Sequence, residues 1–146
     1  MRQYLLNRIP DDVLRECIIP YTYAPQSKEL CEDIRNYFEV SNDLFDMYRK
    51  EYINGYENED KEWLINDITR FMNQDQATMY GYIDYYIQFF RRMYRLQTAD
   101  RDKVIKFFER SELYPFPRDI NRNIALMTPA ERKQMKNFIM RINNYS

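Results

Sequence analysis

The sequence predicts an all-α protein of about seven or eight helices. Apolar residues recur at steps of three and four along most of the chain, which is the spacing of one helix face, and no segment shows the two-residue alternation of a strand. Proline, serine, threonine and aspartate stand where helices would begin. The length of 146 residues and the apolar share of 45% suit one domain or two small packed units.

The first helix is expected to begin at Pro10 and to end before Pro20. Proline suits the first turn of a helix, and the carboxylates of Asp11 and Asp12 suit its positive end. The stretch from Pro20 to Pro25 must then be extended or turned, because proline disfavours a helix before it. The apolar face of this first helix would comprise Val13, Leu14, Cys17 and Ile18.

Two further helices are expected between Ser27 and Gly55. Ser27 is placed to cap the second helix, and Ser41 or Asn42 is placed to cap the third, which Gly55 ends. The inner face of the second would carry Leu30, Cys31, Ile34, Tyr37 and Phe38, and that of the third Leu44, Phe45, Tyr48 and Tyr52.

The polar, acidic run of residues 54–60 is the expected boundary between two parts of the chain. We expect a three-helix N-terminal unit in residues 1–55 that packs on a C-terminal helical region in residues 56–146. The two parts could instead form one continuous domain.

A fourth helix and a long fifth helix are expected after this boundary. Asp75 is placed to cap the fifth, and Gly81 inside it would cost about 1 kcal/mol relative to alanine. The inner face of the fourth would carry Trp63, Leu64, Ile68, Phe71 and Met72, and that of the fifth Met79, Tyr80, Ile83, Tyr86, Ile87, Phe90, Met93 and Tyr94.

The C-terminal part of the chain holds the clearest local signal. Thr98 is placed to cap a sixth helix, and residues 114–117, which contain two prolines, predict a rigid break. Thr128 is followed by proline at the first helical position and by Glu131 at the third, which is the pattern of a capping box. The apolar stripe behind it is Met135, Phe138, Ile139 and Ile142.

Composition excludes many kinds of active site. The chain has no histidine, so histidine-based catalysis and mixed cysteine–histidine zinc sites are out. Two cysteines cannot build a four-thiolate site, and two glycines cannot build a glycine-rich phosphate loop. We therefore expect a protein that is not an enzyme and needs no cofactor or metal. No apolar stretch is long enough to span a membrane and no signal peptide is evident, so we expect an intracellular protein.

Charge is divided unevenly along the chain. Residues 1–79 hold 9 basic and 16 acidic side chains, whereas residues 80–146 hold 13 basic and 7 acidic ones, although the whole chain has a formal net charge of −1. The two halves could attract and pack on each other, or each could face a different partner, including a second copy of the chain.

Arg91, Arg92 and Arg95 are a candidate basic contact surface in the second half. Aromatic residues stand among them, and this combination can bind single-stranded nucleic acid. Because Tyr86, Phe90 and Tyr94 follow one helical stripe, we interpret them as core residues behind a basic outer face. The chain is not basic overall and has no nucleic-acid-binding signature, so we do not expect a nucleic-acid partner.

Residues 9–53 carry a partial family resemblance. The Ile-Pro-x-x-Val-Leu pattern of residues 9–14, the double-proline segment 20–25 and the Val-Ser pair at 40–41 before an aromatic helix resemble the F-box, in the form found in short proteins of large DNA viruses. The double-proline linker is longer than the usual turn of that family, and tyrosine stands where the family often closes with tryptophan.

The resemblance implies a three-helix hook that docks on the Skp-type adaptor of a cullin–RING ubiquitin ligase, while the rest of the chain recruits a target. The residues that it would place against the adaptor are Ile9, Pro10, Val13, Leu14 and Ile18. The same apolar stripe could equally close the protein's own core. We therefore expect a non-enzymatic interaction adaptor in the host cytoplasm or nucleus. The alternative is a helical structural component of a large virus particle, since aromatic and arginine-rich surfaces suit packing against neighbours.

Overall fold

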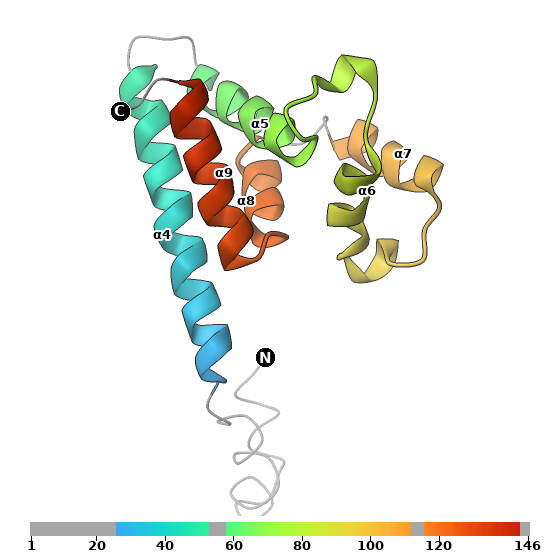
Figure 1. Ribbon diagram of the computed structural model, residues 1–146, viewed down its shortest axis with the longest axis horizontal. Coiled ribbons are helices and arrows are strands. Elements are labelled where there is room, and N and C mark those ends of the chain that lie inside the picture. The colour runs from blue at the N-terminus through green and yellow to red at the C-terminus, as the bar shows by residue number, and fades with distance from the viewer. Residues whose placement is uncertain (1–25, 53–57, 112–115, 144–146) are drawn as a thin grey trace, which may run out of the picture. The chain divides into compact units, whose positions relative to one another are not determined.

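The computed structural model describes residues 26–52, 58–111 and 116–143, and every regular element in these ranges is helical (Figure 1). This confirms the all-α class. The described residues form six α-helices and two short 3-10 helices. The elements are α4 (Lys28–Glu51), α5 (Glu59–Met72), η2 (Thr78–Tyr80), α6 (Asp84–Arg91), η3 (Tyr94–Leu96), α7 (Arg101–Ser111), α8 (Phe116–Ala125) and α9 (Pro129–Ile142).

The chain divides into two compact units, Met1–Glu32 and Asp33–Ser146. Of the first unit, only residues 26–32 are described. The first expected helix, from Pro10 to Pro20, lies outside the described residues.

The second and third expected helices are one continuous helix of 24 residues, α4. Ser27 does cap it, because the Leu30 backbone N–H donates to Ser27 Oγ at 3.2 Å. The expectation that Ser41 or Asn42 caps a new helix is wrong: both lie in the middle of α4, and Ser41 is buried. No glycine or proline interrupts the segment, and the buried side chains of Val40, Leu44 and Tyr48 continue a single stripe across it.

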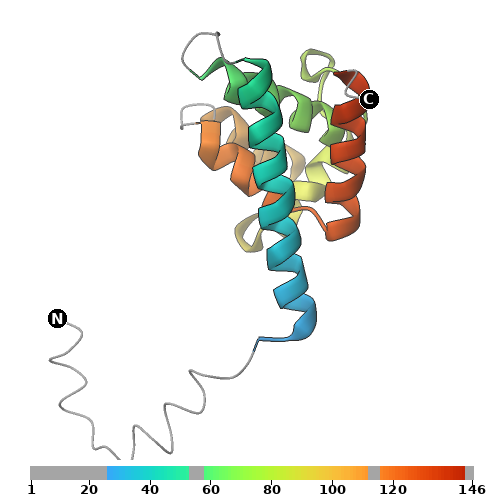
Figure 2. The ribbon, with the colours of Figure 1, turned by 90° about the vertical axis from the view of Figure 1, so that its left-hand side faces the viewer.

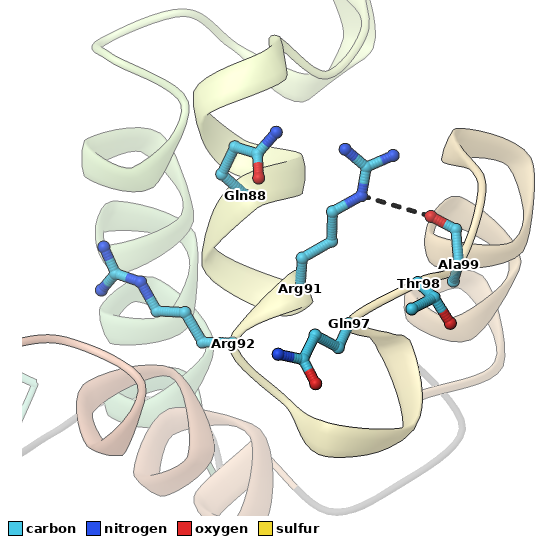
Figure 3. Close-up of a pocket in the computed structure, with 6 residues that line it drawn as sticks. All are labelled: Gln88, Arg91, Arg92, Gln97, Thr98 and Ala99. Carbon is cyan, nitrogen blue, oxygen red and sulfur yellow. Dashed lines mark hydrogen bonds between the residues drawn. The ribbon is translucent and has the colours of Figure 1, made fainter.

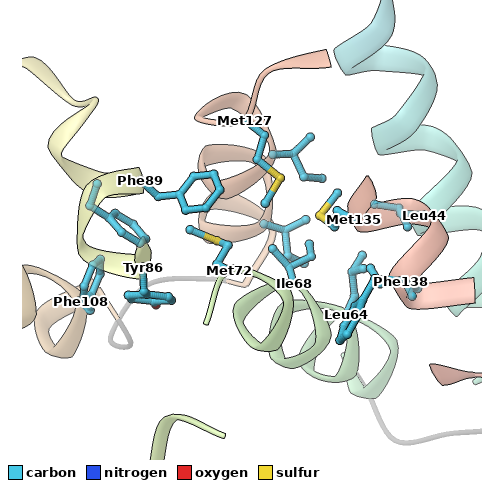
Figure 4. Packing of buried hydrophobic residues seen from close by; sticks show 14 of the residues in the cluster. Leu44, Leu64, Ile68, Met72, Tyr86, Phe89, Phe108, Met127, Met135 and Phe138 are labelled. Atoms are coloured by element: carbon cyan, nitrogen blue, oxygen red, sulfur yellow. The ribbon is translucent and has the colours of Figure 1, made fainter. Parts of the chain in front are cut away.

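The core of the second unit forms where α5 packs against both α8 and α9. Helix α4 runs parallel to α9, since contacts between them join residues that advance together along both helices (Figures 1 and 2). Figure 4 shows the apolar side chains that meet here, and those with no exposed surface include Leu44, Leu64, Ile68, Met72, Ile120, Ile124, Met135 and Ile139. The predicted inner faces of the fourth and last helices are thereby confirmed in the main, although Trp63 is 48% exposed.

The long fifth helix expected from Asp75 is not continuous. The chain passes through η2, turns at Gly81 with φ of 103°, and only then forms the eight residues of α6. The buried side chain of Asn73 supports this turn: its Nδ2 donates to the Gly81 carbonyl at 3.0 Å, and its Oδ1 accepts from the Ile83 N–H at 3.0 Å. An amide side chain from the preceding helix thus replaces backbone bonds that a longer helix would make.

The burial pattern changes with this break. Tyr86, Ile87 and Phe90 are buried as expected, but Met79, Tyr80 and Tyr94 are 81%, 76% and 95% exposed. These three lie on the short 3-10 turns, where a helical stripe no longer applies. The prediction that Tyr94 belongs to the core is therefore wrong.

Helices α6 and α7 pack together through an aromatic cluster (Figure 4). The Phe108 ring lies 5.0 Å from Tyr86 and 3.8 Å from Phe90, measured between centroids, and both pairs are edge-to-face. The cap of α7 is Asp100 instead of Thr98, because Asp100 Oδ1 accepts the Lys103 N–H at 2.7 Å. A carboxylate interacts more strongly with a helix N-terminus than a hydroxyl does.

Of the two predictions based on prolines in the C-terminal part, the capping box is confirmed and the rigid break is not confirmed at Phe116 and Pro117. The expected rigid break at residues 114–117 is in part the start of a helix, since Phe116 and Pro117 form the first turn of α8. The capping box at the start of α9 is confirmed. The Glu131 N–H donates to Thr128 Oγ1 at 3.3 Å, and the Thr128 N–H donates to Glu131 Oε2 at 2.8 Å.

Candidate functional site

The five residues that the resemblance places against a Skp-type adaptor lie outside the described residues. They are Ile9, Pro10, Val13, Leu14 and Ile18. The candidate sites among the described residues are the three arginines of the second half, the outer face of α4, and one partly open cavity.

Arg92 is committed to a contact inside the protein. Its guanidinium forms a bidentate pair with Glu131 at 2.7 and 2.8 Å, and it also donates to the Leu126 carbonyl at 2.7 Å. The same group lies 4.4 Å from the centroid of the Phe89 ring. Arg92 therefore joins the end of α6 to the start of α9.

The pair of Arg92 and Glu131 is ionised. The hydrogen bonds from Arg92, followed by those from Thr128, lower the pKa of Glu131 from its ordinary 4.5 to about 2, against the opposing effect of burial. The hydrogen bond with Glu131 in turn raises the pKa of Arg92. The positive charge of Arg92 is thus neutralised at short range.

Arg95 lines a different depression from Arg91 and Arg92. Its guanidinium lies 5.2 Å from the centroid of the Phe107 ring, and it lines an open depression of about 650 Å³ along α7. Asp100 and Asp102 line the same depression, together with the basic side chains of Lys103, Lys106 and Arg110, so basic side chains outnumber acidic ones there.

Arg91 lines a different depression, about 580 Å³ in volume, between the end of α6 and the turn that precedes α7 (Figure 3). We call it the Arg91 pocket; its lining residues are Gln88, Arg91, Arg92, Gln97, Thr98 and Ala99. Arg91 Nε donates to the Ala99 carbonyl at 3.2 Å. The structure therefore brings Arg91 and Arg92 to one depression and Arg95 to another, and the three do not form one continuous surface.

The outer face of α4 also departs from the expected burial pattern. Leu30, Ile34 and Phe38 were expected on an inner face, yet they are 44%, 43% and 58% exposed. The first buried residue of α4 is Val40. The expectation fails because a stripe in the sequence says that a helix is amphipathic but does not say whether a neighbour covers the stripe.

Arg132 explains which side of α4 faces the core. This arginine is 2% exposed, and it donates to Asp33 Oδ1 at 2.6 Å and to Asn36 Oδ1 at 3.3 Å. Successive residues of a helix are about 100° apart around its axis. Ile34 and Phe38 therefore lie on a different side of α4 from the residues that contact Arg132. Nothing in the sequence around Arg132 marked it as a buried anchor; its partners stand 96 and 99 residues earlier.

A partly open cavity of about 290 Å³ lies beside the aromatic cluster, and Asp119 and Arg122 of α8 line it. The two form an ion pair at 2.8 Å. Burial raises the pKa of Asp119 and lowers the pKa of Arg122. The Arg122 guanidinium also lies 5.6 Å from the Phe90 ring and 5.5 Å from the Phe107 ring, so this pair holds α8 against α6 and α7.

Comparison of the chain with protein-family models, with curated proteins and with solved structures finds no match. None of the described helices is both long enough and apolar enough to cross a membrane. The described ranges also hold no group of three or more side chains placed to bind a metal ion together.

Proposed function

We propose that the protein is a non-enzymatic interaction adaptor of the F-box-like kind, and that the outer face of α4 forms part of its contact with a protein partner. The observation that supports this is the exposure of Ile34 and Phe38, two large apolar side chains one turn apart on the same helix. Exposed apolar side chains grouped on one face are typical of binding surfaces.

Burial of this face against a partner would contribute favourably to binding. Full burial of one isoleucine or phenylalanine side chain stabilises a complex by about 1.5–3 kcal/mol. Glu39 and Arg35 are exposed next to these side chains and would form a polar rim. Phe38 also packs edge-to-face on Tyr37, with 5.4 Å between centroids, and Tyr37 is held under the Arg132 guanidinium at 5.7 Å. The Phe38 ring is thus supported from behind.

The partner that we propose is a Skp-type adaptor, because α4 falls within the residues 9–53 that resemble an F-box. The continuous α4 departs from the separate second and third helices of that resemblance. The proposal accordingly assigns two contributions to the contact, one from the stripe of Ile9, Pro10, Val13, Leu14 and Ile18 and one from Ile34 and Phe38.

A pull-down with the purified full chain tests this proposal. We expect a Skp-type adaptor to be retained by the wild type and by Tyr94→Ser, which removes an equally exposed aromatic ring elsewhere. We expect retention to fall at least tenfold, about 1.4 kcal/mol, in the double variant Ile34→Ser with Phe38→Ser and in the double variant Pro10→Ala with Leu14→Ala. If the wild type does not retain the adaptor, the F-box-like function is wrong.

The alternative function is that of a structural component in a large virus particle. The observation that favours it is the exposure of Met79, Tyr80 and Tyr94 on η2 and η3, so that large side chains are presented on more than one element. Neighbouring subunits in a particle would cover such side chains. Mass spectrometry of purified particles decides this: stoichiometric abundance supports the structural role, and absence from the particles eliminates it.

A further inference from the structure

The Arg91 pocket presents one positive charge that no described residue neutralises. Arg92 is paired with Glu131, and no aspartate or glutamate lines the pocket. Arg101 at the start of α7 is paired with Asp84. We propose that the Arg91 pocket is a carboxylate-binding site, which takes the side chain of a glutamate or aspartate in an acidic segment of a protein partner. This inference does not depend on the proposed function.

Arg91 is held in place for this role. Its Nε–H donates to the Ala99 carbonyl at 3.2 Å, and Ala99 is only 8% exposed. Ala99 is itself fixed, because its N–H donates to the Leu96 carbonyl at 3.1 Å. Figure 3 shows that the two terminal nitrogens of Arg91 point away from this bond, and within the described part of the chain they have no hydrogen-bond partner.

The free end of this guanidinium matches the geometry of a carboxylate. Two parallel N–H groups in one plane can bind the two carboxylate oxygens at once, which is stronger and more specific than a contact with a lysine. The side chains of Gln88, Gln97 and Thr98 line the same pocket. Amide and hydroxyl groups both donate and accept hydrogen bonds, so they suit the polar backbone next to an acidic side chain.

The arrangement of cations favours a peptide over a nucleic acid. A strand of nucleic acid needs a groove in which successive positive side chains follow its phosphates. Of the three arginines in this region, Arg92 is neutralised by Glu131, and Arg95 lies in a separate depression, whose other charged side chains belong to α7 and the turn before it and do not line the Arg91 pocket. Arg91 is left as a single recognition point, which suits one carboxylate.

Fluorescence anisotropy with labelled peptides tests the site. The probes are a hexaglutamate peptide, a hexaglutamine peptide of the same length and a single-stranded oligothymidine, each titrated with the full chain at constant salt. We expect the hexaglutamate peptide to bind more tightly than both others. Arg91→Gln should weaken its binding at least tenfold, since hydrogen bonds between charged groups are worth that factor. Arg91→Lys, which keeps the positive charge but loses the two parallel N–H donors, should also weaken the binding of hexaglutamate.

Arg110→Gln is the matched control, because it removes an exposed arginine that lies outside the Arg91 pocket. It should change hexaglutamate binding less than twofold. Circular dichroism of each variant checks that the loss of the bond to Ala99 has not unfolded the chain. Three results would overturn the proposal: equal binding of the two peptides, equal effects of Arg91→Gln and Arg110→Gln, or preferential binding of the oligothymidine that depends on Arg91.

Discussion

Replacement of Glu131 by glutamine removes the carboxylate that joins α6, the Leu126–Thr128 turn and α9. This carboxylate accepts two hydrogen bonds from Arg92 at 2.7 and 2.8 Å and closes the capping box with Thr128. The Glu131 side chain is only 15% exposed, so solvent screens these contacts weakly. Glutamine has nearly the same shape, and the variant therefore isolates the effect of the charge.

The magnitude follows from the pKa of Glu131. A decrease from 4.5 to about 2 corresponds to about 3 kcal/mol by which the folded protein favours the ionised carboxylate. The amide oxygen of glutamine can still accept a neutral hydrogen bond, so we expect Glu131→Gln to lower the free energy of unfolding by about 2–3 kcal/mol at neutral pH.

The sign of the pH dependence is determined by the same values. Below a pH of 4.5 the unfolded chain binds a proton at Glu131, while the folded chain stays ionised down to a pH of about 2. The stabilisation by Glu131 is therefore complete above about pH 5 and is lost as the pH falls toward 2. In the Glu131→Gln variant, the decrease in stability over this pH window should be smaller than in the wild type.

Urea denaturation followed by circular dichroism at several pH values between 2 and 7 measures both effects. Glu109→Gln on α7 is the matched control, because Glu109 is exposed and makes none of these contacts. The reasoning is refuted if the two variants lose the same stability at neutral pH, or if the Glu131→Gln profile runs parallel to that of the wild type.

Three further predictions concern the packing of the second unit, and urea denaturation measures each of them. Arg132→Ala should lower the free energy of unfolding by about 2–5 kcal/mol, because it empties the space of a buried side chain and leaves the Ile124 carbonyl without its hydrogen bond, whereas Lys133→Ala next to it should cost less than about 1 kcal/mol. Thr128→Ala should cost about 1 kcal/mol through loss of the helix cap, and an unchanged midpoint would contradict the role of the capping box. Gly81→Ala should lower the free energy of unfolding by about 1–3 kcal/mol through backbone strain alone, because an added Cβ would meet no atom within 4 Å. A neutral outcome would mean that the φ of 103° does not constrain this position.

The amino-acid sequence alone determined the features that depend on neighbours within one or two helical turns. The all-α class follows from the three- and four-residue spacing, which every described helix obeys. The start of α9 was predicted because the capping box needs only the four residues from Thr128 to Glu131. The buried faces of α5 and α9 were predicted for the same reason, since each is a complete stripe within one helix.

Tertiary contacts decided the rest. Ser41 has the side chain of a helix cap, yet it lies buried in the middle of a continuous α4, on the face that Val40 and Leu44 turn to the core. The break before α6 depends on Asn73, which reaches 8 and 10 residues along the chain to Gly81 and Ile83. The three arginines differ for a similar reason: Glu131, 39 residues from Arg92, neutralises that residue, whereas Arg91 has no acidic partner among the described residues. Burial and ion pairing depend on which distant segments meet in space, and the local spacing of residue types does not carry that information.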